Sequence, residues 1–316
     1  MMNADFYNLT QLIQGNLFAA MQTCHADHVA KAEPPPPLLQ IRRGYAESPG
    51  WFLIQAAEFD PEPLTVENLR IRDIYASERI VQALLEMLAG ERWLERRGER
   101  YYLTTAGQAL IQRLKTRTAN LLSLPLPKIP QETIHTIEKD LGHIINLSIK
   151  HDSHPEAWCL IHSRNRAPVA TASPLEKISQ YCADFNAFRD DAHMAAWQTE
   201  QVDGYVWEAF NLVHSRQTTN AQEIFETLFY RGYSQEEYAG ALQTLTELGW
   251  LTTQATDSHN YQVSELGQTI RNRVETKTDA YFYAPWKALS QEMVDETQTR
   301  LQHWNDSLKT LSASNH

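Results

Sequence analysis

Apolar residues recur at helical spacing along most of the chain. In residues 3–31 they repeat every three or four positions, which predicts a helix that ends before the four prolines of residues 34–37. The proline run is typical of a stiff, extended spacer. The same pattern predicts helices over residues 131–150, 174–194 and 287–309.

A shorter pattern occurs twice between these helices: helix, short helix, turn, helix, alternating hairpin, helix. Ser77 and Ser234 stand where an N-cap belongs, each before a helix with one apolar face. Gly90 and Gly249 are expected to end these helices in the left-handed conformation. The stretch "WLERRGERYYLT" alternates and turns at Gly98, and "WLTTQATDSHNYQVS" alternates in the same way, so each predicts a two-stranded hairpin.

The two halves of the chain resemble each other. "YASERIVQALLEMLAGERWL" (residues 75–94) aligns with "YSQEEYAGALQTLTELGWL" (residues 233–251) with one gap, and "YYLTTAGQALIQRLKTRT" aligns with "YQVSELGQTIRNRVETKT". The offsets between paired segments stay between 154 and 160, as expected for a duplication with small loop changes. We therefore predict two copies of one domain, residues 1–155 (copy one) and residues 156–316 (copy two).

The stretch "LLEMLAGERWLERRGERYYLTTAGQAL" resembles the recognition helix, wing and following helix of MarR-type winged-helix regulators. Copy two also resembles a related bacterial helix-turn-helix group. The resemblance implies a mainly α fold with small β-hairpin wings, in which two tandem winged-helix domains form a pseudo-two-fold helical arrangement. It further implies that the terminal helices make a shared body. The two presented helices would then lie about 34 Å apart, the spacing of successive major grooves.

Charge separates the two copies. The chain carries a formal charge of −11, yet residues 70–117 hold ten Lys and Arg against six Asp and Glu. Residues 231–277 hold four against six. Because affinity for DNA comes from neutralising phosphates, copy one is the copy expected to bind double-stranded DNA. The residues predicted to contact DNA are Arg96, Arg97 and Arg100 at phosphate, and Arg79 and Gln82 at base edges.

Two alternatives stay open. The arginines of the first hairpin also suit a solvated tip, with Glu95 and Glu99 as partners. The presented helix of copy two, "SQEEYAGALQTLTEL", contains three glutamates and no cation. The second hypothesis is therefore a winged-helix module that binds no DNA and instead docks a basic protein partner or senses a small molecule.

Aromatic residues accompany His193, His214 and Arg216 in the helical regions. The resemblance implies a pocket for a planar effector there, whereas aromatic stripes at helical spacing are also typical of a core. The ligand-binding residues therefore stay unassigned. The aromatic residues in question are Trp51, Phe52, Trp158, Trp197, Tyr205, Trp207, Phe210, Tyr281, Phe282, Tyr283 and Trp286.

Histidine and cysteine occur together at the junction of the two copies and in one helix. Neither group has the spacing of a closed zinc site, so we expect no metal and no cofactor. The cysteines are too few and too irregular for a disulfide framework. The residues concerned are His151, His154, Cys159 and His162 in "HDSHPEAWCLIH", and Cys24 and His28 in "CHADH".

Catalytic motifs are not found: the sequence has no phosphate-binding glycine loop, nucleophile elbow or His-Glu-x-x-His, so we expect no enzyme. No apolar run reaches the 18 or so residues that span a bilayer, and the N-terminus does not read as a signal peptide. These patterns predict a cytoplasmic protein that contacts no membrane.

Overall fold

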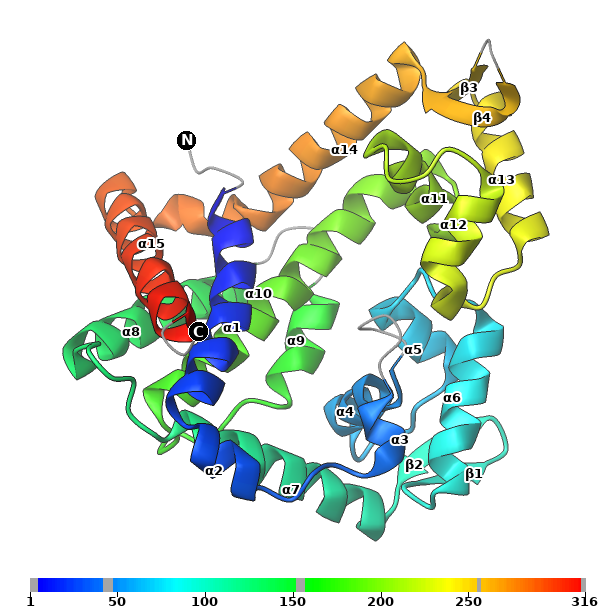
Figure 1. The fold of residues 1–316 in the computed structure, drawn as a ribbon. Helices are drawn as coiled ribbons and strands as arrows, with labels where there is room; N and C mark the ends of the chain where they lie inside the picture. The colour runs from blue at the N-terminus through cyan, green and yellow to red at the C-terminus, as the bar shows by residue number, and fades with distance from the viewer. Residues whose placement is uncertain (1–4, 42–47, 152–156, 255–256, 314–316) are drawn as a thin grey trace. The chain divides into compact units, whose positions relative to one another are not determined.

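The computed structural model describes residues 5–41, 48–151, 157–254 and 257–313. They form a mainly helical fold with two small antiparallel hairpins, as the sequence predicts (Figure 1). The chain divides into two compact units. Unit 1 comprises residues 1–35, 110–192 and 279–316, and unit 2 comprises residues 36–109 and 193–278.

Each unit takes segments from both halves of the sequence. The predicted domains, residues 1–155 and 156–316, follow the order of the repeat along the chain and stay a prediction. The compact units follow instead from which segments share a core. The chain passes from one unit to the other between residues 35 and 36. It does so again within three helices: α7 (Thr105–Leu122), α10 (Pro174–Trp197) and α14 (Glu265–Phe282).

The first segment, residues 48–109 of unit 2, contains one hairpin and the helices before it. Its third helix begins at Ser77, whose Oγ accepts a hydrogen bond from the backbone N–H of Ile80, as predicted for an N-cap. Leu84 and Leu88 of that helix are fully buried. The elements are α4 (Pro49–Phe59), α5 (Val66–Arg72), α6 (Glu78–Gly90), β1 (Leu94–Arg97), β2 (Arg100–Leu103) and the start of α7.

The first hairpin is tied to the helices by a third extended piece. Leu94 pairs with Leu103 at its base, and Gly98, with a φ of 66°, makes the turn. Leu64 exchanges two backbone hydrogen bonds with Tyr101, at 2.8 and 2.9 Å. This bridge holds β2 against the loop before α5.

The second segment, residues 203–278 of unit 2, repeats this order of elements. Ser234 forms a capping box at the start of its third helix. The backbone N–H of Tyr261 donates to the carbonyl of Thr219 at 2.7 Å, in the place of the Leu64–Tyr101 bridge. The elements are α11 (Gly204–His214), α12 (Ala221–Leu228), η2 (Phe229–Arg231), α13 (Gln235–Glu247), β3 (Leu251–Gln254), β4 (Asp257–Val263) and the start of α14.

A left-handed glycine was predicted at the end of each presented helix, α6 and α13, and it is found in only one of the two. Gly249 has a φ of 75° and ends α13 in the left-handed conformation, as predicted. Gly90 was expected to do the same for α6, which is wrong: Gly90 is the last residue of α6, and the left-handed residue is Arg92, with a φ of 61°. The chain reverses at Arg92, where the N–H of Trp93 donates to the carbonyl of Leu88.

A close backbone approach occurs after each hairpin. A Cβ atom on Gly107 would lie 2.2 Å from the carbonyl oxygen of Trp93, and one on Gly267 would lie 2.2 Å from that of Trp250. In both places only glycine lets the last helix start this close to the strand. The same close approach to a tryptophan carbonyl therefore explains why glycine stands at the aligned position in each half.

Unit 1 is helical. The helix predicted over residues 131–150 is found at those bounds, whereas the one predicted over residues 3–31 divides into two helices, with residues 3 and 4 outside the described residues. Besides the parts of α7, α10 and α14, unit 1 contains α1 (Asp5–Cys24), α2 (Ala26–Lys31), α8 (Gln131–Lys150), α9 (Trp158–Arg164), η3 (Ala284–Ala288) and α15 (Gln291–Ala313). Two further short elements belong to unit 2: α3 (Pro37–Gln40) and η1 (Gln198–Glu200).

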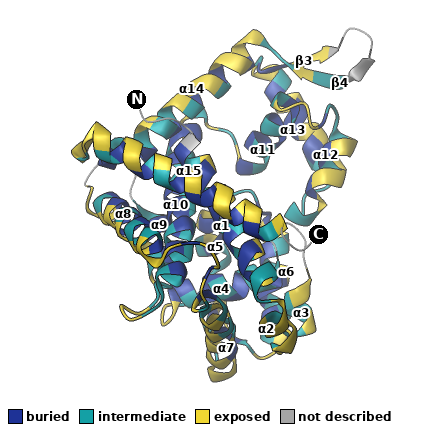
Figure 2. Cartoon of the chain, turned by 60° about the vertical axis from the view of Figure 1, so that its left-hand side comes forward, coloured by how far each residue is buried: buried dark blue, intermediate teal, exposed yellow. Residues whose placement is uncertain are grey.

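The core of unit 1 lies where α1 and α15 pack side by side. Each of these helices buries one face, and α15 leaves the other exposed (Figure 2). Phe6 and Trp286 meet edge to face with ring centroids 4.6 Å apart, and Phe185 and Phe282 surround them. Helices from the two ends of the sequence therefore share one core.

Candidate nucleic-acid interface

The first hairpin carries three arginines at its tip. Arg97 lies opposite Arg100 in the strand register, and Arg96 precedes them on β1. The guanidinium of Arg97 lies over the ring of Tyr102, 4.8 Å from its centroid, and that of Arg96 lies 6.0 Å from the centroid of Tyr101. Two aromatic rings on β2 thus support two of the cations.

Carboxylates balance part of this charge. Arg97 pairs with Glu95 and Arg96 with Glu86, each at 2.6 Å, and both arginine side chains stay more than half exposed. The hydrogen bond from Arg97 lowers the pKa of Glu95. Arg100 is exposed and has no ion pair among the described residues. The tip therefore offers one uncompensated cation and two that are held in water-exposed pairs.

Glu86 connects α6 to the hairpin. Its Oε1 accepts hydrogen bonds from Gln82 Nε2, Tyr101 Oη and Arg96 Nη1, at 2.8, 2.6 and 2.6 Å. Gln82 also donates to Tyr101 Oη at 2.6 Å. Burial and the contact with Glu86 raise the pKa of Tyr101. Gln82, expected to face base edges, is thus engaged with the hairpin in this conformation.

Sequence reasoning did not find the role of Glu86. The available signal was its spacing: Gln82 and Glu86 are four residues apart and so lie on one face of α6. The partner of that face could not be read from the sequence, because it depends on how the hairpin folds back over the helix. The pairing of Arg97 with Glu95, in contrast, follows from neighbouring positions on one strand.

Arg79 lies at the first turn of α6 and contacts the second segment. Its Nη2 donates to Glu237 Oε2 at 2.6 Å, and its guanidinium also donates to the carbonyl oxygen of Gly232. The side chain of Arg79 is 62% exposed and that of Glu237 is 37% exposed. The residue expected to face base edges is therefore paired within unit 2, at its surface.

A buried seam joins the two segments beneath this pair. The N–H of Ser77 donates to the carbonyl of Arg231 at 2.9 Å. The guanidinium of Arg231 contacts both oxygens of Asp73, at 2.9 and 3.0 Å, and Glu208 Oε1 at 2.7 Å. Burial, offset only in part by Arg231, raises the pKa of Glu208 to about 7. The seam thus has two carboxyl groups and one guanidinium.

The helices α6 and α13 both begin at this seam. Their first turns are in direct contact through Arg79 and Glu237. This differs from the expected separation of about 34 Å between presented helices. The hydrogen bond of Ser77 and the buried contacts of Arg231 account for the difference.

The surface of α13 is acidic. No Lys or Arg occurs in Gln235–Glu247, and Glu237 is the glutamate engaged by Arg79. Phosphate would be repelled by the remaining carboxylates. The exposed residues of the helix are Gln235, Glu236, Ala239, Gly240, Gln243, Thr244 and Glu247.

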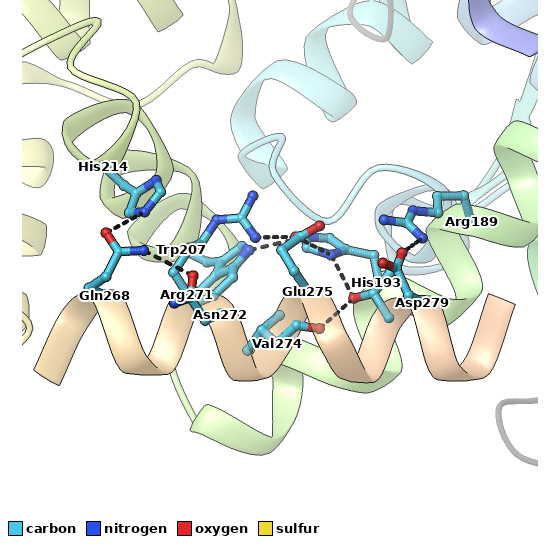
Figure 3. A network of polar contacts seen from close by, with 11 residues as sticks. Arg189, His193, Trp207, His214, Gln268, Arg271, Asn272, Val274, Glu275 and Asp279 are labelled. Atoms are coloured by element: carbon cyan, nitrogen blue, oxygen red, sulfur yellow. Dashed lines mark hydrogen bonds and ion pairs between the residues drawn. The ribbon is translucent and has the colours of Figure 1, made fainter. Parts of the chain in front are cut away.

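Polar contacts hold α14 against the helices beside it (Figure 3). Trp207 Nε1 donates to His193 Nε2 at 3.2 Å, and His193 Nδ1 lies 3.2 Å from Thr278 Oγ1. Arg271 pairs with Glu275 one turn along α14. His193, one of the residues considered for an effector pocket, therefore bridges α10, α11 and α14.

The aromatic residues considered for a pocket are largely core residues. Trp197, Trp207 and Phe210 are at most 1% exposed, and the rings of Trp197 and Trp207 are nearly parallel with centroids 5.9 Å apart. An open recess on α15 is lined by polar residues between Asp295 and His303 and contains none of these aromatics.

The His and Cys group at the junction is only partly described, because His154 lies outside the described residues. His162 Nδ1 contacts the carbonyl of Trp158 at 2.8 Å, and the N–H of Cys159 donates to Asp191 at 2.8 Å. No group of three or more His, Cys, Asp or Glu placed to hold a metal ion occurs within the described ranges. None of the three cysteines forms a disulfide.

Among the helices of the described ranges, none combines the length and the apolar composition needed to cross a membrane.

Comparison with known proteins gives one result. No curated protein and no solved structure is significantly similar to the chain. Residues 163–313 match a family described as a helix-turn-helix family. The matched range contains α12, η2 and α13. The match supports a helix-turn-helix domain in the back half of the chain.

Proposed function

We propose that this protein is a regulator that binds double-stranded DNA through the first hairpin. Arg97 and Arg100 contact phosphates at the tip, and Arg96 adds a third cation beside them. The observation that carries the proposal is the position of these side chains: exposed, at the end of a two-stranded projection, and in two cases supported by an aromatic ring. Fixed guanidiniums on a projecting hairpin suit a phosphate backbone or a narrow minor groove.

The ion pairs of the hairpin do not oppose this function strongly. An exposed pair contributes little to stability, because water and salt screen it. Arg97 can therefore exchange Glu95 for a phosphate at little cost, and Arg96 can do the same with Glu86. The released carboxylates stay hydrated at the surface.

The tandem, MarR-like arrangement is part of the proposal. Three parallels between the segments support it: the order of elements, the caps at Ser77 and Ser234, and the close approaches at Gly107 and Gly267. The helix-turn-helix match covers the second of the two segments. The first turns of α6 and α13 contact each other, so the two presented helices do not form two separate DNA-binding surfaces. In this proposal the first hairpin therefore supplies most of the DNA contact.

The test is fluorescence anisotropy with a labelled random-sequence duplex at low salt. The variant Arg97→Glu/Arg100→Glu is expected to bind about tenfold more weakly or worse, because two phosphate contacts become repulsive. The matched control Lys287→Glu/Lys309→Glu makes the same change of charge on η3 and α15 and is expected to bind like the unaltered protein. Equal losses in both variants, or no binding by the unaltered protein, would refute the proposal.

A second candidate function rests on the acidic surface of α13. Glu236 and Glu247 are exposed on a helix without a cation, which suits docking of a basic protein segment. A labelled Lys/Arg-rich peptide should then bind the full chain and lose binding on Glu236→Lys/Glu247→Lys. If the substitution leaves the affinity for the peptide unchanged, α13 is excluded as the docking surface.

A further inference from the structure

The first turn of α6 is occupied by the second segment. In helix-turn-helix proteins the N-terminal residues of the presented helix contact base edges. Here Arg79, the cation of that turn, donates to Glu237 Oε2 and to the carbonyl oxygen of Gly232. These two partners present the kinds of oxygen that DNA also presents. The carboxylate of Glu237 is anionic, like a phosphate, and the carbonyl of Gly232 is an acceptor like those at base edges.

The carboxylate of Glu237 is held in place by its own helix. Its Oε2 accepts a hydrogen bond of 2.6 Å from the N–H of Ser234, and its N–H donates to Ser234 Oγ. Burial is the largest single influence and opposes ionisation, but the hydrogen bonds from Arg79 and Ser234 together outweigh it and lower the pKa of Glu237. The carboxylate of Glu237 is therefore an anion that its own helix orients, independently of the contact with Arg79.

The seam below keeps this anion in place. Asp73 and Glu208 both hold Arg231, and the side chain of Arg231 is only 11% exposed. The pair of Arg79 and Glu237, in contrast, is open to water. Because the ion pair of Arg79 and Glu237 is exposed and weak, a competing anion can displace the carboxylate from Arg79. The buried contacts of Arg231 then still hold the two segments together.

We propose that Glu237 is a built-in competitor for DNA at Arg79. In the conformation described here the carboxylate of the second segment occupies the guanidinium, and duplex DNA must displace it before the first turn of α6 can take part in binding. The inference rests on the proposed function of the first hairpin and deepens it. It also gives the acidic helix α13 a role: it restrains binding by the first segment.

Glu237→Gln tests this directly, because glutamine keeps an acceptor for Ser234 and removes the charge from Arg79. The variant is expected to bind the random duplex about two- to fivefold more tightly at low salt, the factor that an exposed ion pair supplies. The slope of log K against log salt is expected to steepen by about one phosphate contact. Glu236→Gln is the matched control, since it removes the same charge one residue away, outside the pair with Arg79. It is expected to change the affinity less.

A double-mutant cycle separates this mechanism from a general effect of charge. Arg79→Ala is expected to change the affinity of the otherwise unaltered chain little, because Arg79 is occupied. In the Glu237→Gln background it is expected to remove the whole gain. The single variant Arg79→Ala also tests the idea without relying on Glu237→Gln being well folded.

Two results would overturn the inference. One is that Glu237→Gln and Glu236→Gln raise the affinity equally; the other is that Arg79→Ala alone weakens binding as much as Arg100→Ala does. In both cases the unaltered protein still binds DNA through the hairpin, so the proposed function stands. If neither the unaltered chain nor Glu237→Gln binds duplex, the proposed function itself has failed and the inference with it.

Discussion

The guanidinium of Arg97 lies over the ring of Tyr102, 4.8 Å from the ring centroid. The face of an aromatic ring attracts a cation at this position electrostatically. Tyr102→Leu is therefore expected to weaken duplex binding by about two- to fivefold, because Arg97 loses its support and must be ordered by the DNA. Tyr102→Phe keeps the ring and should bind like the unaltered protein. Anisotropy titrations of the two variants check this, and equal affinities would show that the ring does not position Arg97.

Arg92 is a non-glycine residue in the left-handed region, with a φ of 61°. That conformation costs a side-chain-bearing residue about 1–2 kcal/mol, and glycine avoids it. Arg92→Gly is thus expected to raise the free energy of unfolding by up to about 1 kcal/mol after the added chain entropy of glycine is subtracted. Urea denaturation measures it. Glu91→Gly is the control: Glu91 is right-handed, so this change is expected to destabilise.

Gly107 and Gly267 each stand against a tryptophan carbonyl. Gly107→Ala and Gly267→Ala are expected to lower the free energy of unfolding by about 1–3 kcal/mol, because the new methyl group displaces backbone. Gly240→Ala is the matched control: it is an exposed glycine in α13 with no atom close enough to clash, and it should stabilise the helix by up to about 1 kcal/mol. Equal free energies of unfolding for all three variants would contradict this prediction.

The raised pKa of Glu208 makes the seam sensitive to pH. The ordinary pKa of a glutamate is 4.5 and that of Glu208 in the folded protein is about 7. Below pH 4.5 the group is protonated in both states. Between pH 4.5 and 7 the unfolded chain loses this proton first, so the folded state loses stability as pH rises, and the effect levels off above about pH 7.

Glu208→Gln removes this titration and keeps an acceptor for Arg231. Compared with the variant, the unaltered protein is expected to lose about 5 °C of Tm between pH 5 and pH 8. Thermal unfolding followed by circular dichroism at both values measures the difference. Parallel pH profiles would mean that Glu208 is ionised throughout this range.

Local features of the fold could be read from the sequence. Ser77 and Ser234 cap their helices as predicted, because a cap depends on residues within one turn. The first hairpin was equally predictable from its alternation and from Gly98. The exception is the end of α6, where the pattern offered Gly90 and the chain used Arg92, which no propensity would favour.

Long-range relationships could not be read in this way. The partners of Arg79, Gln82 and Arg96 come from segments up to 158 residues away, and nothing in the local pattern names them. The similarity between the two halves of the sequence did imply that similar surfaces exist twice. It did not indicate that the first turns of α6 and α13 would meet, since that depends on the contacts of Arg231.

The packing of α1 on α15 has a consequence for synthesis of the protein. The helix Asp5–Cys24 buries its apolar face against Gln291–Ala313, which is synthesised after it. During translation that face stays without its partner until α15 has left the ribosome, and the ring of Phe6 lacks its contact until Trp286 has been made. A nascent chain that ends before α15 would consequently carry an open aromatic surface.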